Sequence, residues 1–183
     1  CQLPGKSLEI CCMHLDKGQM WIGTTTDGAY RLQLDKNELT HPILKGNITS
    51  IYQDSEGELW IGSWEEGLHH VKTDGTIEIF EYDAKNPYSI SSNFVRACCE
   101  DNLGNIWIGT FNGLNRYDKS TGLFQNHTAS DAQSDGLTHS SIWCIVKDNQ
   151  GTLWLGTYFG GVNYFNPEYE IYSRYMYSPI EKK

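Results

Sequence analysis

The stretch GNIWIGTFNGLNRYD, from Gly104 to Asp118, decides the fold because four versions of it occur along the chain. The versions are centred on four tryptophans spaced 39, 47 and 47 residues apart: Trp21, Trp60, Trp107 and Trp154. Each has a glycine three residues before the tryptophan, another two residues after it, then a Ser or Thr, and a further glycine in the next turn. These positions take twelve of the 18 glycines, so the glycines serve a repeated scaffold and not one site.

An apolar segment that ends in aspartate precedes each version, at Asp16, Asp54, Asp101 and Asp148. One full unit therefore predicts four antiparallel strands, over residues 94–100, 106–110, 114–117 and 123–128. Between the first two strands, Asp-x-x-Gly predicts a tight turn in which the aspartate accepts hydrogen bonds from backbone amides and the glycine takes a positive φ. Four strands in about 40 to 50 residues, repeated, are typical of a propeller blade.

We therefore predict an all-β fold, a β-propeller segment of four four-stranded antiparallel blades within a single unit spanning 1–183. The blades are expected at about 8–43, 47–82, 93–128 and 140–177. The tryptophan should lie between adjacent blades, and the glycine two residues after it should let the backbone of the neighbouring blade approach. Because an open arc exposes its two outer faces, we expect it to close as a four-bladed ring or to pair with a second copy of the chain.

The unit resembles the two-component regulator propeller repeat in its Asp-x-x-Gly-x-Leu-Trp-Ile-Gly-Thr pattern, in the following Gly-Leu-Asn-Arg-Tyr-Asp and in the lead-in NPYSISSNFVRACCED. The resemblance implies part of a larger ring of about seven blades. It also implies the periplasmic sensor region of a bacterial hybrid two-component system, in which a histidine kinase and a response regulator are fused. Such a region would detect a glycan-derived ligand and relay a conformational signal that regulates transcription of polysaccharide-use genes.

Charge and composition argue against several other functions. The chain has 14 Lys and Arg against 23 Asp and Glu, a net charge of -9, and no basic cluster that could follow a nucleic-acid backbone. Its longest purely apolar run, Ile142 to Val146, is far shorter than the roughly 20 residues of a membrane helix, so we expect no direct membrane insertion by this segment.

The sequence predicts neither an enzyme nor a cofactor site. It contains no Gly-x-Ser-x-Gly, His-Glu-x-x-His or P-loop motif. The adjacent His69 and His70 should point to opposite faces of a strand and so cannot share a metal. The Asp-x-x-Gly turns lack the dense oxygen ligands of a calcium loop, and we expect no bound metal.

The six cysteines show no Cys-x-x-Cys spacing, and five of them lie on the predicted first strands. The position four residues before the turn aspartate holds Cys12, Ser50, Ala97 and Cys144, all small, which we attribute to crowding of the inner strands around the axis. We predict buried free thiols that act as small apolar groups. The chain opens on Cys1 without an initiator Met, which is typical of either a fragment boundary or a processed terminus.

Two tryptophans, Trp64 and Trp143, do not belong to the repeat pattern. Antiparallel order places the turns after the second strands on the same face as the long connections between blades. Five residues before each turn aspartate, at the start of the first strand, Arg96 and Trp143 reach the same face. The face therefore gathers aromatic, amide, carboxylate and basic side chains: Trp64, Glu65, Glu66, Asn93, Arg96, Phe111, Asn112, His139, Trp143, Tyr158 and Phe159.

This combination predicts a sugar-binding surface, because CH groups of a sugar stack on aromatic rings while its hydroxyls take paired hydrogen bonds. The same aromatic side chains could instead pack over a neighbouring blade or against another protein. In that case the propeller would be an interaction scaffold without a small-molecule ligand.

Overall fold

The computed structural model describes residues 9–40, 42–129, 136–169 and 171–175, which form sixteen strands and no helix. The strands make four separate four-stranded antiparallel sheets, each in sequential order. The predictions of an all-β fold and of four-stranded blades are therefore confirmed. Among these residues, none belongs to a helix that could cross a membrane. Cys1, residue 8 and residues 176–177, to which predictions referred, lie outside the described residues.

Each sheet is one blade. Blade 1 consists of β1 (Ile10–Asp16), β2 (Gln19–Thr24), β3 (Ala29–Gln33) and β4 (Glu38–Leu39). Blade 2 consists of β5 (Ile48–Gln53), β6 (Leu59–Ser63), β7 (Leu68–Val71) and β8 (Ile77–Phe80). Blade 3 consists of β9 (Val95–Glu100), β10 (Ile106–Thr110), β11 (Gly113–Asp118) and β12 (Leu123–His127). Blade 4 consists of β13 (Ile142–Lys147), β14 (Leu153–Thr157), β15 (Val162–Asn166) and β16 (Ile171–Tyr175).

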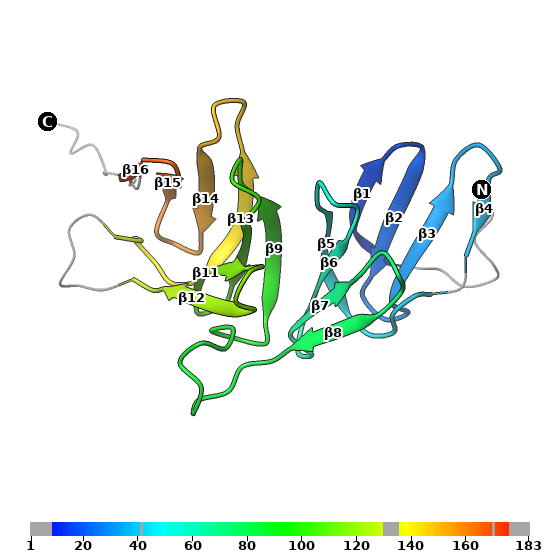
Figure 1. Cartoon of the computed structure of the whole chain (residues 1–183), viewed down its shortest axis with the longest axis horizontal. Helices are drawn as coiled ribbons and strands as arrows, with labels where there is room; N and C mark the ends of the chain where they lie inside the picture. The colour runs from blue at the N-terminus through cyan, green and yellow to red at the C-terminus, as the bar shows by residue number, and fades with distance from the viewer. Residues whose placement is uncertain (1–8, 41, 130–135, 170, 176–183) are drawn as a thin grey trace, which may run out of the picture.

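The four blades stand side by side, with β4 of blade 1 and β16 of blade 4 on opposite outer sides of the molecule (Figure 1). The first strands β1, β5, β9 and β13 contact one another in sequence and form the inner wall. In blade 3 the strand predicted over 106–110 coincides with β10. The strands predicted over 94–100 and 123–128 differ from β9 and β12 by one residue at one end, and the strand predicted over 114–117 is one residue shorter than β11 at each end.

The Asp-x-x-Gly turns form as predicted in blades 2, 3 and 4. Asp54, Asp101 and Asp148 each accept two backbone amides with Oδ1, and the turn glycines have φ between 82° and 87°. The second oxygen, Oδ2, accepts the indole N–H of the tryptophan six residues later, at 2.9, 2.7 and 2.8 Å. One carboxylate therefore fixes both the turn and the orientation of the repeat tryptophan.

In blade 1 the repeat tryptophan is held in a different way. Its turn is one residue shorter, with both Lys17 and Gly18 at positive φ. The indole of Trp21 donates to Oε1 of Gln53 in blade 2, at 3.1 Å, and not to an aspartate of its own turn. The repeat tryptophan is held in each case, by the turn of its own blade or by the neighbouring blade.

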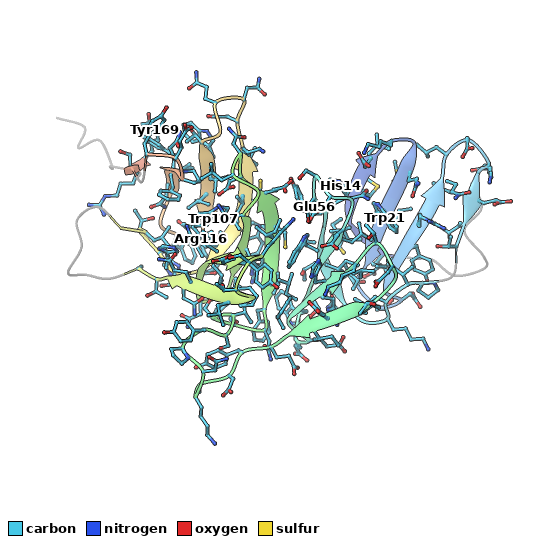
Figure 2. All side chains as sticks on the ribbon, in the orientation of Figure 1. His14, Trp21, Glu56, Trp107, Arg116 and Tyr169 are labelled. Atoms are coloured by element: carbon cyan, nitrogen blue, oxygen red, sulfur yellow. The ribbon has the colours of Figure 1, made fainter. Side chains whose placement is uncertain are left out.

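Three of the four repeat tryptophans, Trp21, Trp60 and Trp107, lie between blades as predicted, and Figure 2 labels Trp21 and Trp107. Trp154 is only half-buried, because no further blade follows blade 4 among the described residues. Trp60 is fully buried and packs with Val95 and Ile106 of blade 3, while Trp107 packs with Leu153 and Phe165 of blade 4. The prediction about the glycine two residues later needs a correction. A Cβ on Gly62 would lie 2.7 Å from the side chain of Val95, so the group that needs the space is a side chain of the next blade and not its backbone.

The space needed by a side chain of the next blade also explains why the position four residues before the turn aspartate holds a small residue. Cys12, Ser50, Ala97 and Cys144 pair directly across the ladder with Gly23, Gly62, Gly109 and Gly156. In the first three blades the glycine lies against Ile48, Val95 or Ile142, the first residue of the next β strand. The small pair thus makes room for a β-branched side chain of the next blade, and crowding around the axis was the wrong reason.

The cysteines are free thiols within the described residues, but only some are buried. Cys98 and Cys99 lie in the cores between blades, and burial raises the pKa of Cys98 to about 12. Cys11 and Cys144 are exposed, so the prediction of burial was wrong for these two. Cys144 is exposed because blade 4 has no following blade among the described residues.

Both outer faces of the arc are apolar and uncovered. Met13 and Leu15 on blade 1 are each 62% exposed, and Val146 and Tyr175 on blade 4 are exposed to a similar degree. The equivalent of Met13 in blade 3 is the buried Cys98, so these positions are made for contact with another blade. Pairing with a second copy or with other blades of a longer chain stays a prediction.

Candidate ligand-binding face

Each first strand carries a β-bulge at the same place, five residues before the turn aspartate. The ladder registers skip one residue on each first strand, and the skipped residues are Cys11, Thr49, Arg96 and Trp143. A bulge leaves its extra residue unpaired and turns its side chain away from the normal alternation of the strand. The bulge therefore presents one chosen side chain per blade at the end where the first strand begins.

In blades 1 and 2 the bulge residue connects neighbouring blades. The thiol of Cys11 donates to the carbonyl of Ile48, and the hydroxyl of Thr49 donates to the carbonyl of Val95. In both cases the acceptor lies at the start of the first strand of the next blade. These two positions therefore contribute to the scaffold.

In blade 3 the bulge residue is Arg96, and it lies over aromatic rings of three blades. Its guanidinium carbon is 4.0 Å from the ring centroid of Trp143, 5.2 Å from that of Trp64 and 5.9 Å from that of Phe111. Such contacts stabilise a cation through the negative face of the ring, by about 0.5–2 kcal/mol each. The structure thus brings together four predicted residues from blades 2, 3 and 4.

The turns between second and third strands carry the other rings. Trp64, Phe111 and Tyr158 occupy the same position in their repeats, directly after the Ser or Thr. Each donates its backbone N–H to a carbonyl just before the first strand of its own blade: Asn47, Phe94 and Ser141, at 3.0 Å. The preceding Ser or Thr hydroxyl bonds the carbonyl of the turn glycine. This backbone frame fixes where the three rings leave the turn.

The rings form two contacting groups, and Arg96 lies over rings of both. Trp143 stacks on Tyr158 with centroids 5.9 Å apart, and Tyr158 contacts Phe159 at 4.3 Å. Phe94 lies between Trp64 and Phe111, at 5.5 and 6.1 Å. We call the two groups together the aromatic rim, and it consists of Trp64, Phe94, Phe111, Trp143, Tyr158 and Phe159. Phe94 was not among the predicted site residues, although its place beside Asn93 at the end of a long connection was a usable signal.

The rim is open to solvent in this chain. The exposed fraction of its side chains runs from 40% for Trp64 to 89% for Phe159, with only Phe94 more covered. Trp64 still meets Phe94 of the next blade edge-on, so the rings pack partly across a blade boundary and leave the rest of their area uncovered. Exposed aromatic area gathered in one place is typical of a surface that binds a ligand or another protein.

The remaining predicted residues fall into two groups. Asn93 and His139 fix the connections, since Asn93 Oδ1 accepts the N–H of Tyr82 at 2.6 Å and His139 Nδ1 accepts the N–H of Ser141 at 3.0 Å. The ring of His139 also meets that of Tyr158 edge-on, at 6.4 Å. Glu65, Glu66 and Asn112 are exposed on the turns beside the rim, where their side chains can reach a ligand.

Arg96 has no acidic partner among the residues that the structure describes. No carboxylate there lies within 4.0 Å of its guanidinium, and its buried Nε makes no hydrogen bond. Burial lowers the pKa of the Arg96 guanidinium below its usual range, although an arginine stays charged at any physiological pH. An unsatisfied buried donor costs about 1–3 kcal/mol.

Other polar groupings of the described chain have their own partners. Asp54, Glu56 and Glu58 lie close together at the β5–β6 turn, where Figure 2 labels Glu56. Lys119 reaches Asp54 at 3.0 Å and Glu56 at 2.8 Å, so this cluster is an ion-pair network.

His69 and His70 make separate contacts. The ring of His70 stacks on the ring of Trp60 with centroids 3.9 Å apart, and its Nε2 lies 2.6 Å from Oε2 of Glu58. His69 is buried, and its burial lowers the pKa of its imidazole. A shallow hollow of about 460 Å³ lies on blade 3 between Tyr88, Arg116 and Phe124, away from the rim.

The sheet geometry, the turns and the packed tryptophans together define a β-propeller segment made of sequence repeats. Residues 42–65, 89–112 and 136–159 match the family model for the two component regulator propeller. The repeats of blades 2, 3 and 4 therefore match the model of the two component regulator propeller family. Its first repeat, with the short turn and the Trp21 to Gln53 bond, is outside the matched residues.

Solved propeller structures resemble the whole arc. The extracellular domains of two hybrid two component systems from B. thetaiotaomicron superpose with TM-scores of 0.75 and 0.74, at 17% and 22% identity over 94% and 99% of this chain. This chain covers 25% and 24% of those chains, so it spans about a quarter of their length.

An enzyme is also among the similar structures. A catalytically inactive virginiamycin B lyase from Staphylococcus aureus, solved with quinupristin, gives a TM-score of 0.71 at 17% identity, covering 97% of this chain and 59% of the lyase. No curated protein sequence matches the chain significantly. Identities this low establish the shared propeller fold and nothing about a shared ligand.

Proposed function

We propose that this chain is part of a non-catalytic, periplasmic sensor module of a hybrid two-component system. In this proposal it binds a glycan-derived ligand at the aromatic rim and relays a conformational signal to a histidine kinase. The family of the repeats and the extracellular two component domains among the similar structures support the sensor role. The observation that carries the ligand is the exposed rim, in which rings of three blades gather around Arg96.

The position of the rim suits a sensor because it spans blade boundaries. Trp64 belongs to blade 2, Arg96 and Phe111 to blade 3, and Trp143 and Tyr158 to blade 4. A ligand that stacks on rings of several blades stabilises one relative position of those blades. Binding can then shift the propeller between two arrangements only as far as the ligand's affinities for the two differ.

The proposal of a non-catalytic module rests on the chemistry of the rim. Its side chains are mainly aromatic, and its one cation lies over three rings instead of facing a nucleophile. Since a lyase occurs among the similar structures, this point needs its own test. Oligosaccharides recovered after long incubation with the chain should be unchanged in size and linkage.

A titration tests the ligand. We expect a panel of plant and host oligosaccharides to include one that releases heat with the chain and quenches tryptophan fluorescence. Trp143→Ala should abolish both signals, because it removes the ring shared by Arg96 and Tyr158. Tyr169→Ala is the matched control, since Tyr169, labelled in Figure 2, is an exposed aromatic on the β15–β16 turn. Antiparallel order puts that turn at the opposite end of blade 4 from the β14–β15 turn that carries Tyr158.

An interaction scaffold is the second candidate, and one observation favours it. Phe159 is 89% exposed at the tip of its turn, more than a sugar-stacking ring requires. If the rim binds a protein, Phe159→Ala should weaken assembly of the chain with itself or with its parent protein while every oligosaccharide fails to bind. Size-exclusion chromatography with light scattering distinguishes this outcome from the sugar-binding one.

A further inference from the structure

Arg96 carries a positive charge that no described carboxylate pairs with, although the chain has many acidic residues. Acidic residues number 23 in the sequence, yet among the described residues none pairs with this guanidinium. Lys72 and Lys119, by contrast, both have carboxylate partners. A half-buried guanidinium whose buried Nε has no partner, and which no described carboxylate neutralises, can take an anion from outside.

The surroundings of Arg96 determine how an anion can approach. The ring of Trp143 lies 4.0 Å from the guanidinium carbon and the ring of Trp64 lies 5.2 Å from it, so aromatic groups take up the space around the planar group. The N–H groups of a guanidinium point outward in its plane and match the two oxygens of a carboxylate. An anion that binds here therefore meets N–H donors at its charged end and indole surfaces beside it.

The acidic turns near Arg96 limit which anionic ligands can bind there. Glu65 and Glu66 are exposed next to Trp64, and the chain carries a net charge of -9. These charges repel a polyanion, whereas a ligand with one acidic group can pair with Arg96 and present its hydroxyls to the glutamates. The face thus favours a sugar with few negative charges over a densely sulfated chain.

We propose that the ligand of the aromatic rim is an acidic sugar, with its carboxylate paired to the Arg96 guanidinium and its ring on Trp143 and Trp64. This inference rests on the proposed function, since it names the chemical class of the ligand for the same face. A sulfate ester offers similar oxygens and is the second source of an anion that the experiment has to separate.

The test compares matched ligands that differ in one group. The probes are four forms of each oligosaccharide in a panel: uronic acid, its methyl ester, the neutral sugar and a singly sulfated neutral sugar. Each is titrated by calorimetry into the chain at constant ionic strength. We expect the uronic acid to bind about tenfold or more tightly than its ester, as a charge-assisted pair implies.

The variants assign that preference to one residue. Arg96→Gln should remove the difference between acid and ester, and Arg96→Lys should keep only part of it because an ammonium lacks the fork of donors. Trp143→Ala should abolish the binding of acid and ester alike. Arg116→Gln is the control, since Arg116 also has a buried Nε without a partner but lies at the hollow on blade 3. Thermal unfolding of each variant establishes that it is folded.

The possible outcomes are distinct. Equal binding of acid, ester and neutral sugar overturns the acidic-sugar inference and leaves the proposed function intact. Preference for the sulfated form over the uronic acid also overturns it. Loss of binding in Arg116→Gln but not in Arg96→Gln moves the site to the hollow, and binding of no sugar form contradicts both the inference and the proposed function.

Discussion

Blades 1 and 2 differ from blades 3 and 4 at one equivalent position, the bulge residue of the first strand. Cys11 and Thr49 are small there and bond the backbone of the next blade. Arg96 and Trp143 are large and lie against each other at the exposed rim. The same bulge therefore serves the scaffold in one half of the arc and a candidate ligand site in the other.

This contrast teaches how to interpret a repeat protein. Residues that recur in every copy, such as the tryptophans and glycines of the second strands, are buried between blades in blades 1, 2 and 3, where another described blade follows. Residues that break the pattern, such as Trp64 and Trp143, are exposed and gathered on one face. Departures from a repeat are thus the first place to look for function, and four experiments test this division.

The largest effect is expected for a repeat tryptophan. Trp60→Ala should lower the free energy of unfolding by about 3–5 kcal/mol, because Trp60 is fully buried between blades 2 and 3. Trp143→Ala should lower it by about 1 kcal/mol or less, since Trp143 is exposed. Urea unfolding followed by far-UV circular dichroism measures both. Equal losses would contradict the division between scaffold and site tryptophans.

A smaller effect is expected at a repeat glycine. Gly109→Ala should cost about 1–3 kcal/mol, because the new Cβ would lie 2.7 Å from Cγ2 of Ile142 in the next blade. Adding Ile142→Ala should recover part of this loss, so that the double variant is more stable than the sum of the two single changes predicts. Strict additivity in a double-mutant cycle would show that the two groups do not compete for space.

Much of this division could be predicted from the sequence. The spacing of the tryptophans predicted the four sheets, and antiparallel order placed Trp64, Phe111 and Tyr158 on one face before any coordinates. These inferences succeed because they depend on chain direction and on a pattern that four copies repeat. The packing of Trp60 and Trp107 between blades follows from the same regularity.

Other features depend on side-chain geometry that one sequence does not specify. Strand alternation alone does not reveal that Arg96 is the extra residue of a bulge, and so its place over Trp143 could not be derived. The hydrogen bond from the Trp60 indole to Asp54 joins two recurring residues, but the distance between them is set by the geometry of the turn, which the sequence alone does not give. Cys144 is exposed only because its blade ends the arc, which a single repeat cannot indicate.

The pH dependence of stability offers a third test of the scaffold. Burial opposes ionisation of Asp54, but hydrogen bonds from Trp60 and Lys119 outweigh it and hold the pKa of this carboxyl below its usual value. A carboxyl whose pKa is lower in the folded chain stabilises the fold above its unfolded pKa, near pH 4, and loses this contribution as the pH falls through the folded value.

In Asp54→Asn the free energy of unfolding should therefore fall less steeply between about pH 5 and pH 2 than in the unchanged chain. Urea unfolding at a series of pH values measures the slope for the chain and for the variant. Asp83→Asn is the control, because Asp83 is exposed on the connection between blades 2 and 3 and is not part of a turn that holds a tryptophan. An unchanged slope in Asp54→Asn would mean that the indole–carboxylate bond contributes little.

The smallest effect concerns Phe159, where site and scaffold requirements conflict. Its φ of 64° lies in the left-handed region, which costs a residue with a side chain about 1–2 kcal/mol, and its ring is 89% exposed. Phe159→Gly should raise the free energy of unfolding by up to about 1 kcal/mol, because the strain removed exceeds the extra freedom of glycine in the unfolded chain. The same change should weaken ligand binding at the rim, measured by calorimetry. A variant that is more stable and binds equally well would place Phe159 outside the site, and the ligand would then lie on Trp64, Arg96 and Trp143 alone.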